Sequence, residues 1–141
     1  MTRYLTATSL VICVLALGLV THAAAGCQVD IDIKPWSCPN SINLRGQGVI
    51  PVAFLTTACF DATTIDPATV TFGPAHAMPV HAGYCGHIED ADGDGDMDLV
   101  FHFNTQETGI QPGDTEATIW GRTYGGLDVW GTGPIRTVPP R

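Results

Sequence analysis

Basic residues are scarce in this sequence. Its 141 residues include six Lys and Arg against 14 Asp and Glu, which gives a formal net charge of −8 at pH 7. Lys34 is the only lysine. Nucleic acids and anionic membrane surfaces are bound mainly through clustered Lys and Arg side chains. We therefore expect neither of them as a partner.

The sequence also lacks an apolar run long enough to span a bilayer, which takes about 20 residues. Its main apolar run, Leu10–Val20, has 11 residues, follows Arg3 and precedes the small residues around Ala25. This pattern is typical of a secretory signal peptide. We predict a signal peptide over residues 1–26, cleavage near Ala25, and a mature domain over residues 27–141 that is secreted or displayed at the cell surface. Residues 24–27 also resemble a lipobox, in which Cys27 would carry a lipid anchor.

No helical stripe of apolar residues is present after residue 26. Short runs rich in Val, Ile, Thr and Phe alternate instead with clusters of Gly, Pro, Asn and Asp, which is typical of an all-β sandwich. We predict an all-β, Ig-like β-sandwich of seven to eight strands. The expected strands are Val29–Lys34, Val49–Thr57, Thr69–Phe72, Met78–His81, Leu99–Asn104, Ala117–Tyr124, Leu127–Trp130 and Ile135–Val138. Pro51 indicates that Val49–Thr57 is an edge strand or contains a β-bulge.

Signatures of catalysis are missing too. There is no G-x-S-x-G elbow and no phosphate-binding glycine loop. His81, His87 and His102 are separated by spacings that match no zinc motif. His102 alternates with Phe101 and Phe103, so we expect it on the surface. We predict that the protein is not an enzyme.

The acidic residues are concentrated in one segment. Six of the 14 lie between Glu89 and Asp98, and counting from Asp90 as position 1 puts carboxylates at positions 1, 3, 5, 7 and 9, with Gly95 at position 6. Ca²⁺ takes six to eight oxygen ligands, and alternating acids on a tight turn supply them. Mg²⁺ keeps its waters and suits such a loop poorly. We predict one Ca²⁺ loop between two strands, with the ligands Asp90, Asp92, Asp94, Asp96 and Asp98. Position 7 usually offers its backbone carbonyl, so we expect the Asp96 side chain in solvent.

The D-x-D-x-D-G-x-x-D pattern resembles the calcium loops of FG-GAP repeats, thrombospondin type 3 repeats and dockerins. The stretches 31–44 (IDIKPWSCPNSINL), 48–74 and 79–110 (with DADGDGDMDLVFHF) also resemble an uncharacterised secreted bacterial domain. This resemblance implies a β-domain with a metal loop and implies no activity. The secreted bacterial domain often occurs as a module on larger exported proteins.

Four cysteines remain after the signal peptide: Cys27, Cys38, Cys59 and Cys85. An even number in an oxidising compartment suggests two disulfide bonds. Cys38 and Cys59 look unusual for the secreted domain, and we predict that they pair across a hairpin-like connection. Cys59–Cys85 is the alternative.

The function that we expect is that of a secreted calcium-binding module with a structural, adhesion or binding role, whose partner is an extracellular protein or polysaccharide. A carbohydrate-binding or surface-display domain is the second possibility, because Trp36, Trp120, Trp130 and Tyr124 could stack on sugar rings. A metal-dependent hydrolase, using the histidines with the acidic loop, is the third.

Overall fold

A computed structural model describes residues 25–81 and 86–138 of the chain. The predicted signal peptide lies almost entirely outside the described residues, and so does Cys85. The strands are β1 (Cys27–Gln28), β2 (Ile31–Ile33), β3 (Ser41–Asn43), β4 (Val49–Phe54), β5 (Ile65–Phe72), β6 (His87–Glu89), β7 (Asp98–Asn104), β8 (Glu116–Thr123), β9 (Asp128–Pro134) and β10 (Arg136–Val138). Two short 3₁₀ helices, η1 (Ala62–Thr64) and η2 (Thr105–Glu107), follow β4 and β7.

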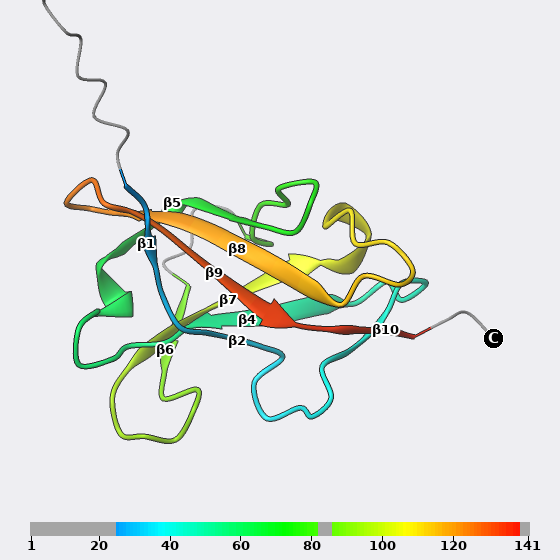
Figure 1. The fold of residues 1–141 in the computed structure, drawn as a ribbon, viewed down its shortest axis with the longest axis horizontal. Helices are drawn as coiled ribbons and strands as arrows, with labels where there is room; N and C mark the ends of the chain where they lie inside the picture. Colours follow the sequence, from blue (N-terminus) through cyan, green and yellow to red (C-terminus); the bar gives the residue numbers. More distant parts are fainter. Residues whose placement is uncertain (1–24, 82–85, 139–141) are drawn as a thin grey trace, which may run out of the picture.

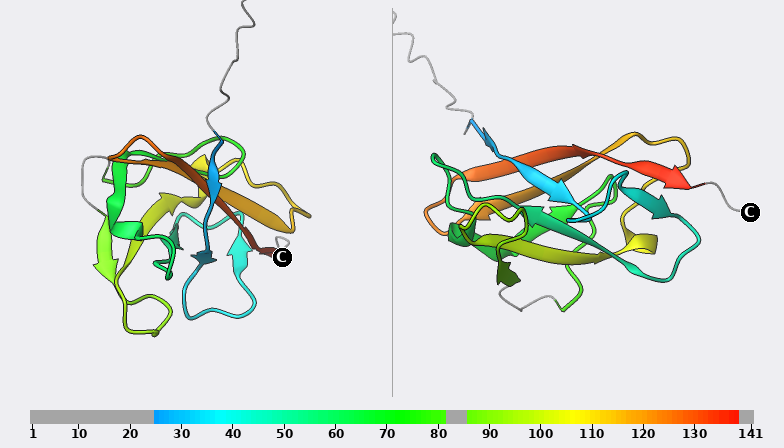
Figure 2. Two further views of the ribbon diagram at one scale, coloured as in Figure 1. Left: turned by 60° about the vertical axis from the view of Figure 1, so that its left-hand side comes forward. Right: turned by 90° about the horizontal axis from the view of Figure 1, so that it is seen from below.

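Two four-stranded sheets form the two layers of the molecule (Figures 1 and 2). One has the strand order β1-β9-β8-β5, and the other has the order β2-β4-β7-β6. A small parallel pair, β10 with β3, extends one end of the sandwich. The predicted all-β sandwich is confirmed.

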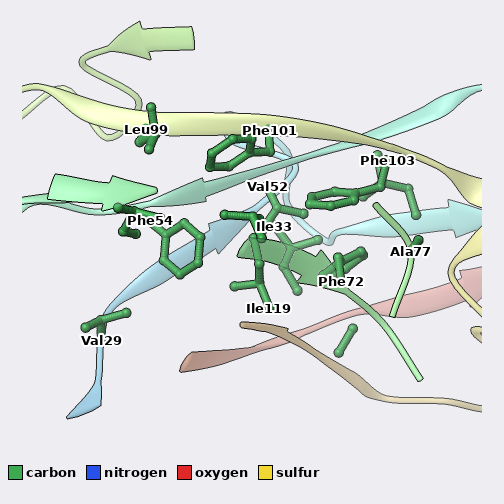
Figure 3. Packing of buried hydrophobic residues seen from close by; sticks show 14 of the residues in the cluster. Val29, Ile33, Val52, Phe54, Phe72, Ala77, Leu99, Phe101, Phe103 and Ile119 are labelled. Carbon is green, nitrogen blue, oxygen red and sulfur yellow. The ribbon is translucent and has the colours of Figure 1, made fainter. Parts of the chain in front are cut away.

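The core lies between the two sheets and is built by alternating side chains (Figure 3). On β7, Leu99, Phe101 and Phe103 point inward, as their spacing of two residues predicts. The ring of Phe101 meets that of Phe54 on β4 edge-on, with 6.3 Å between centroids. The ring of Phe103 contacts Phe72 of the opposite sheet at 5.1 Å. The second of these contacts joins the two layers, because Phe72 lies on β5 and Phe103 on β7.

Pro51 lies inside β4, a central strand, where a missing backbone N–H would usually break a ladder. Its carbonyl faces the end of β2 and accepts from the Lys34 N–H at 2.8 Å. Lys34 has a positive φ of 55°, and its own carbonyl accepts from Ser37 at 3.0 Å instead of from residue 51. The strand therefore tolerates proline because its neighbour ends at that point.

The structure differs from the predicted strands in three places. Ten strands are present among the described residues rather than seven or eight, because β1, β3 and β6, of two or three residues each, were not predicted. Such short segments carry too few alternations to be visible in a sequence. Residues 78–81 form no strand in this structure, and the strand that enters the acidic loop begins only at His87.

The predicted Cys38–Cys59 disulfide is wrong. Cys27, Cys38 and Cys59 are exposed free thiols. Antiparallel pairing of β2 with β4 places the chain that follows Ile33 near the beginning of β4, whereas Cys59 follows its end. The six residues of β4 cover about 20 Å, far beyond the reach of a disulfide. The alternative pair involves Cys85, which is not among the described residues.

No helix within residues 25–81 and 86–138 is both long and apolar enough to cross a membrane.

Candidate metal centre

The acidic loop is held at both ends by strand pairing. Glu89, the last residue of β6, pairs with Asp98, the first residue of β7, so residues 90–97 form the connection of an antiparallel hairpin. This is the predicted position of the loop between two strands. In Figure 1 the loop extends from β6 and β7 beside the turn that carries Trp36. The Trp36 ring lies so near Gly93 that a Cβ atom there would be 3.3 Å from it.

Asp90 organises the turn from within. Its carboxylate accepts backbone N–H bonds from Gly93 at 2.8 Å, from Asp94 at 3.1 Å and from Gly95 at 3.0 Å. Gly93 and Gly95 have φ values of 78° and 100°, in the left-handed region that side chains other than glycine rarely adopt. The alternation of Gly with Asp therefore lets the backbone wrap around the first carboxylate.

Asp98 anchors the loop to the rest of the domain. Its side chain is fully buried and accepts the N–H groups of Thr56 and Ala91, each at 2.8 Å. The Thr56 hydroxyl also donates to the Met97 carbonyl at 2.7 Å. Ala91 packs with Val100 and other small residues on the outer face of the β2-β4-β7-β6 sheet. A carboxylate from the loop is thereby fixed in the protein interior.

All five predicted ligands come together. Carboxylate oxygens of Asp90, Asp92 and Asp98 lie within 4.8 Å of one another, and so do those of Asp92, Asp94 and Asp96. Asp92 belongs to both groups and joins them. The set offers only oxygen donors, which is the chemistry that Ca²⁺ and other hard cations require.

The expectation that the Asp96 side chain points into solvent is wrong. The Asp96 N–H donates to Asp94 Oδ1 at 3.0 Å, and this turn brings the Asp96 carboxylate into the cluster. Its Oδ1 atom is buried and has no hydrogen-bond partner among the described residues. An anionic oxygen in such surroundings suits a cation.

Loss of hydration and the crowding of carboxylates shift the pKa values within the cluster. Loss of hydration, followed by the interactions with Asp94, Asp98 and Asp92, raises the pKa of Asp96 to about 6. Loss of hydration also raises the pKa of Asp92, whereas the backbone N–H of Asp96 lowers that of Asp94. No Lys or Arg occurs in the sequence between Arg45 and Arg122 to offset this charge. A divalent cation would neutralise it.

The three histidines that the sequence spacing did not connect line one hollow, of about 480 Å³, on the outer face of the same sheet. The rings of His87 and His102 stand edge to face with 5.2 Å between centroids. Partial burial and the neighbouring His87 lower the pKa of His102. The described lining of the hollow includes none of the loop carboxylates. The two groups of side chains therefore form separate clusters, and no mixed centre suited to a hydrolase is formed by them.

The aromatic residues do not form one platform. Trp120 and Trp130 lie directly opposite each other on β8 and β9, both half-buried, on the outer face of the other sheet. The His76 ring stacks beside Trp120 with 4.4 Å between centroids. Trp36 lies by the acidic loop, and Tyr124 lies in the turn between β8 and β9, with 80% and 70% of their surface exposed.

Compared with known proteins, the chain matches no family model and no curated protein.

Proposed function

We propose that this protein is an exported β-sandwich module that binds one Ca²⁺ ion in the loop from Asp90 to Asp98. The role of the ion is structural, and the domain serves adhesion or binding outside the cell. No catalytic step is part of this proposal. The resemblance of the loop to FG-GAP and dockerin loops favours calcium among the hard cations.

The burial of Asp98 is the observation that carries the proposal. A carboxylate that is wholly inside the protein is normally compensated by a cation or by hydrogen bonds. Asp98 has two backbone donors, yet carboxylate oxygens of Asp90 and Asp92 also lie within 4.8 Å of its own. Those of Asp94 and Asp96 lie within the same distance of Asp92. Two charges about 4 Å apart repel by roughly 1 kcal/mol in water and by more near a protein surface. A bound divalent ion turns this repulsion into attraction.

Isothermal titration calorimetry of the mature chain tests the site. We expect one Ca²⁺ per chain and much weaker binding of Mg²⁺, which dehydrates reluctantly. Asp92→Asn removes the carboxylate that both groups share and should weaken Ca²⁺ binding at least tenfold. Asp30→Asn is the matched control, because Asp30 is exposed and outside the loop. The proposal is wrong if the wild-type chain binds no Ca²⁺, or if both variants bind it as the wild type does.

Export is tested separately by the intact mass of protein recovered from outside the cytoplasm. Cleavage near Ala25 should leave a chain that begins at residue 26 or 27. A diacylglycerol adduct on Cys27 would establish the lipid anchor, and a chain that retains residues 1–23 would contradict export by this route.

A carbohydrate-binding role is favoured by one observation, the pair of Trp120 and Trp130. Two half-buried indole side chains on directly opposed residues of a sheet face offer aromatic surface of the kind on which sugar rings stack. Titration with soluble polysaccharides should give binding that Trp120→Ala and Trp130→Ala abolish. Tyr124→Ala should leave it unchanged. Equal loss in all three variants, or no binding by the wild type, would exclude this role for the pair.

A further inference from the structure

The hollow lined by His81, His87 and His102 has no part in the calcium site. Besides the histidines, its wall is apolar and includes Val80 and Val100. The three imidazoles in this hollow are nitrogen donors, and such ligands bind transition-metal ions more readily than they bind Ca²⁺.

Strand pairing explains why His87 and His102 meet. The β6–β7 register places His87 opposite Val100, which makes His102 its diagonal neighbour on the same face of the sheet. The two rings are in edge contact, at 5.2 Å and an interplanar angle of 89°. They lie against each other although 14 residues separate them in the sequence.

His81 reaches the same hollow from a different segment. The Val80 N–H donates to the His102 carbonyl at 2.8 Å, so the chain that carries His81 runs beside β7 at this point. His81 itself has a φ of 65°, in the left-handed region that a non-glycine residue adopts at a cost. Backbone strain of this kind is frequent at functional sites.

A carboxylate lies close to the histidines without lining the hollow. Glu89 lies two residues after His87 on β6 and acts on His102 as a nearby negative charge.

We propose that His81, His87 and His102 form a second metal site, for a transition-metal ion of the Zn²⁺ class, on the outer face of the β2-β4-β7-β6 sheet. The three rings line the hollow without converging on one point. His81 and His87 are exposed, and binding requires their rings to turn toward the ion. Water completes the coordination. This inference does not depend on calcium binding by the acidic loop.

Zinc titration of the mature chain tests the site. The thiols of Cys27, Cys38 and Cys59 are exposed and bind zinc, so they are first alkylated. Millimolar Ca²⁺ is kept present to occupy the acidic loop. We expect one Zn²⁺ per chain in competition with a chromophoric chelator. His87→Gln and His102→Gln should each weaken it at least tenfold, since loss of an outer-sphere partner alone costs about 10–100-fold.

His76→Gln is the matched control, because His76 stacks on Trp120 on the other sheet and its removal should leave zinc binding unchanged. Cu²⁺ in place of Zn²⁺ gives an independent readout. Its electron paramagnetic resonance spectrum should show splitting from at least two nitrogens, which His87→Gln reduces.

The inference is overturned by the absence of stoichiometric zinc binding, by an equal loss in the His76→Gln control, or by binding that survives loss of both His87 and His102. If Asp92→Asn abolishes zinc binding while His87→Gln does not, the zinc lies in the acidic loop and the proposed site is wrong. His87 is exposed, so its variant tests the site even if the half-buried His102 proves necessary for folding.

Discussion

The polar and charged side chains of the two sheets have different surroundings. On the β1-β9-β8-β5 sheet, Arg122 pairs with Asp128 at 2.6 Å, and the hydroxyls of Thr118 and Thr132 bond to each other at 2.7 Å across regular strands. On the β2-β4-β7-β6 sheet, five loop carboxylates gather in a sequence segment without Lys or Arg. On the first sheet these side chains find their partners within the chain. For the second, we propose that a bound cation supplies the opposite charge.

This difference separates stability that comes from packing from stability that comes from an ion. A change on the first sheet should cost the same with and without calcium. A change in the acidic loop should have a cost that depends on calcium.

The largest effect is expected for Asp98→Ala. It removes a ligand and leaves the N–H groups of Thr56 and Ala91 without their acceptor. An unsatisfied buried donor costs about 1–3 kcal/mol, so we expect a loss of about 2–4 kcal/mol in calcium, measured by urea unfolding. A loss no greater than that of a surface substitution would contradict the anchoring role of Asp98.

Gly131→Ala should act through packing alone. A Cβ atom at this position of β9 would lie 2.8 Å from the Val29 carbonyl oxygen and would also clash with the Ile31 side chain. Overpacking of a core costs about 1–3 kcal/mol. Urea unfolding with calcium and with EGTA should show the same loss for this variant. A loss that appears only in calcium would mean that the two sheets do not behave independently.

Asp96→Asn should change stability in opposite directions with and without the ion. Without calcium it removes a charge that its neighbours repel, so the melting temperature in EGTA should rise. With calcium it removes a negative oxygen from the site, so the calorimetric affinity should fall. An Asp96 carboxylate that lay in solvent would leave both quantities unchanged, and that result would support the original interpretation of position 7.

The smallest effect is expected for Asp128→Asn. The hydrogen bond from Arg122 lowers the pKa of Asp128, so any stabilisation by the pair is present at neutral pH and is lost only as the pH falls through that lowered pKa. Both side chains are well exposed, and such pairs contribute little. Melting curves of variant and wild type should coincide from pH 8 to pH 5. A clear separation at pH 7 would show that this face also depends on its charges.

The sequence predicts β4, β7 and β8 and the acidic cluster of the loop because these are local patterns. Alternation over Leu99–Asn104 identifies β7, and the spacing of the aspartates identifies the five carboxylates that the structure brings together. The residues that support the loop are not local. Thr56 lies 42 positions from Asp98, and nothing in the sequence connects them.

The histidine hollow and the cysteines also depend on contacts between residues that are distant in the sequence. His87 and His102 become neighbours only through the β6–β7 register, which the sequence does not specify when β6 has three residues. The sequence places the acidic loop between two strands, but it does not give the register that makes His102 the diagonal neighbour of His87. The predicted Cys38–Cys59 pair is wrong because the segments that carry these cysteines lie at opposite ends of β4, which the sequence does not show.

Thermal unfolding of the wild-type chain in calcium and in excess EGTA tests the central claim most directly. With free Ca²⁺ at about 100 times the dissociation constant, binding to the folded state adds about 2.7 kcal/mol, which raises the melting temperature by roughly 5–10 °C in a domain of this size. Asp92→Asn should show a smaller difference between the two solutions, because a tenfold weaker site adds only about 1.4 kcal/mol at the same calcium concentration. If the wild-type curve does not move when calcium is replaced by EGTA, the acidic loop is not a structural calcium site and the account is wrong.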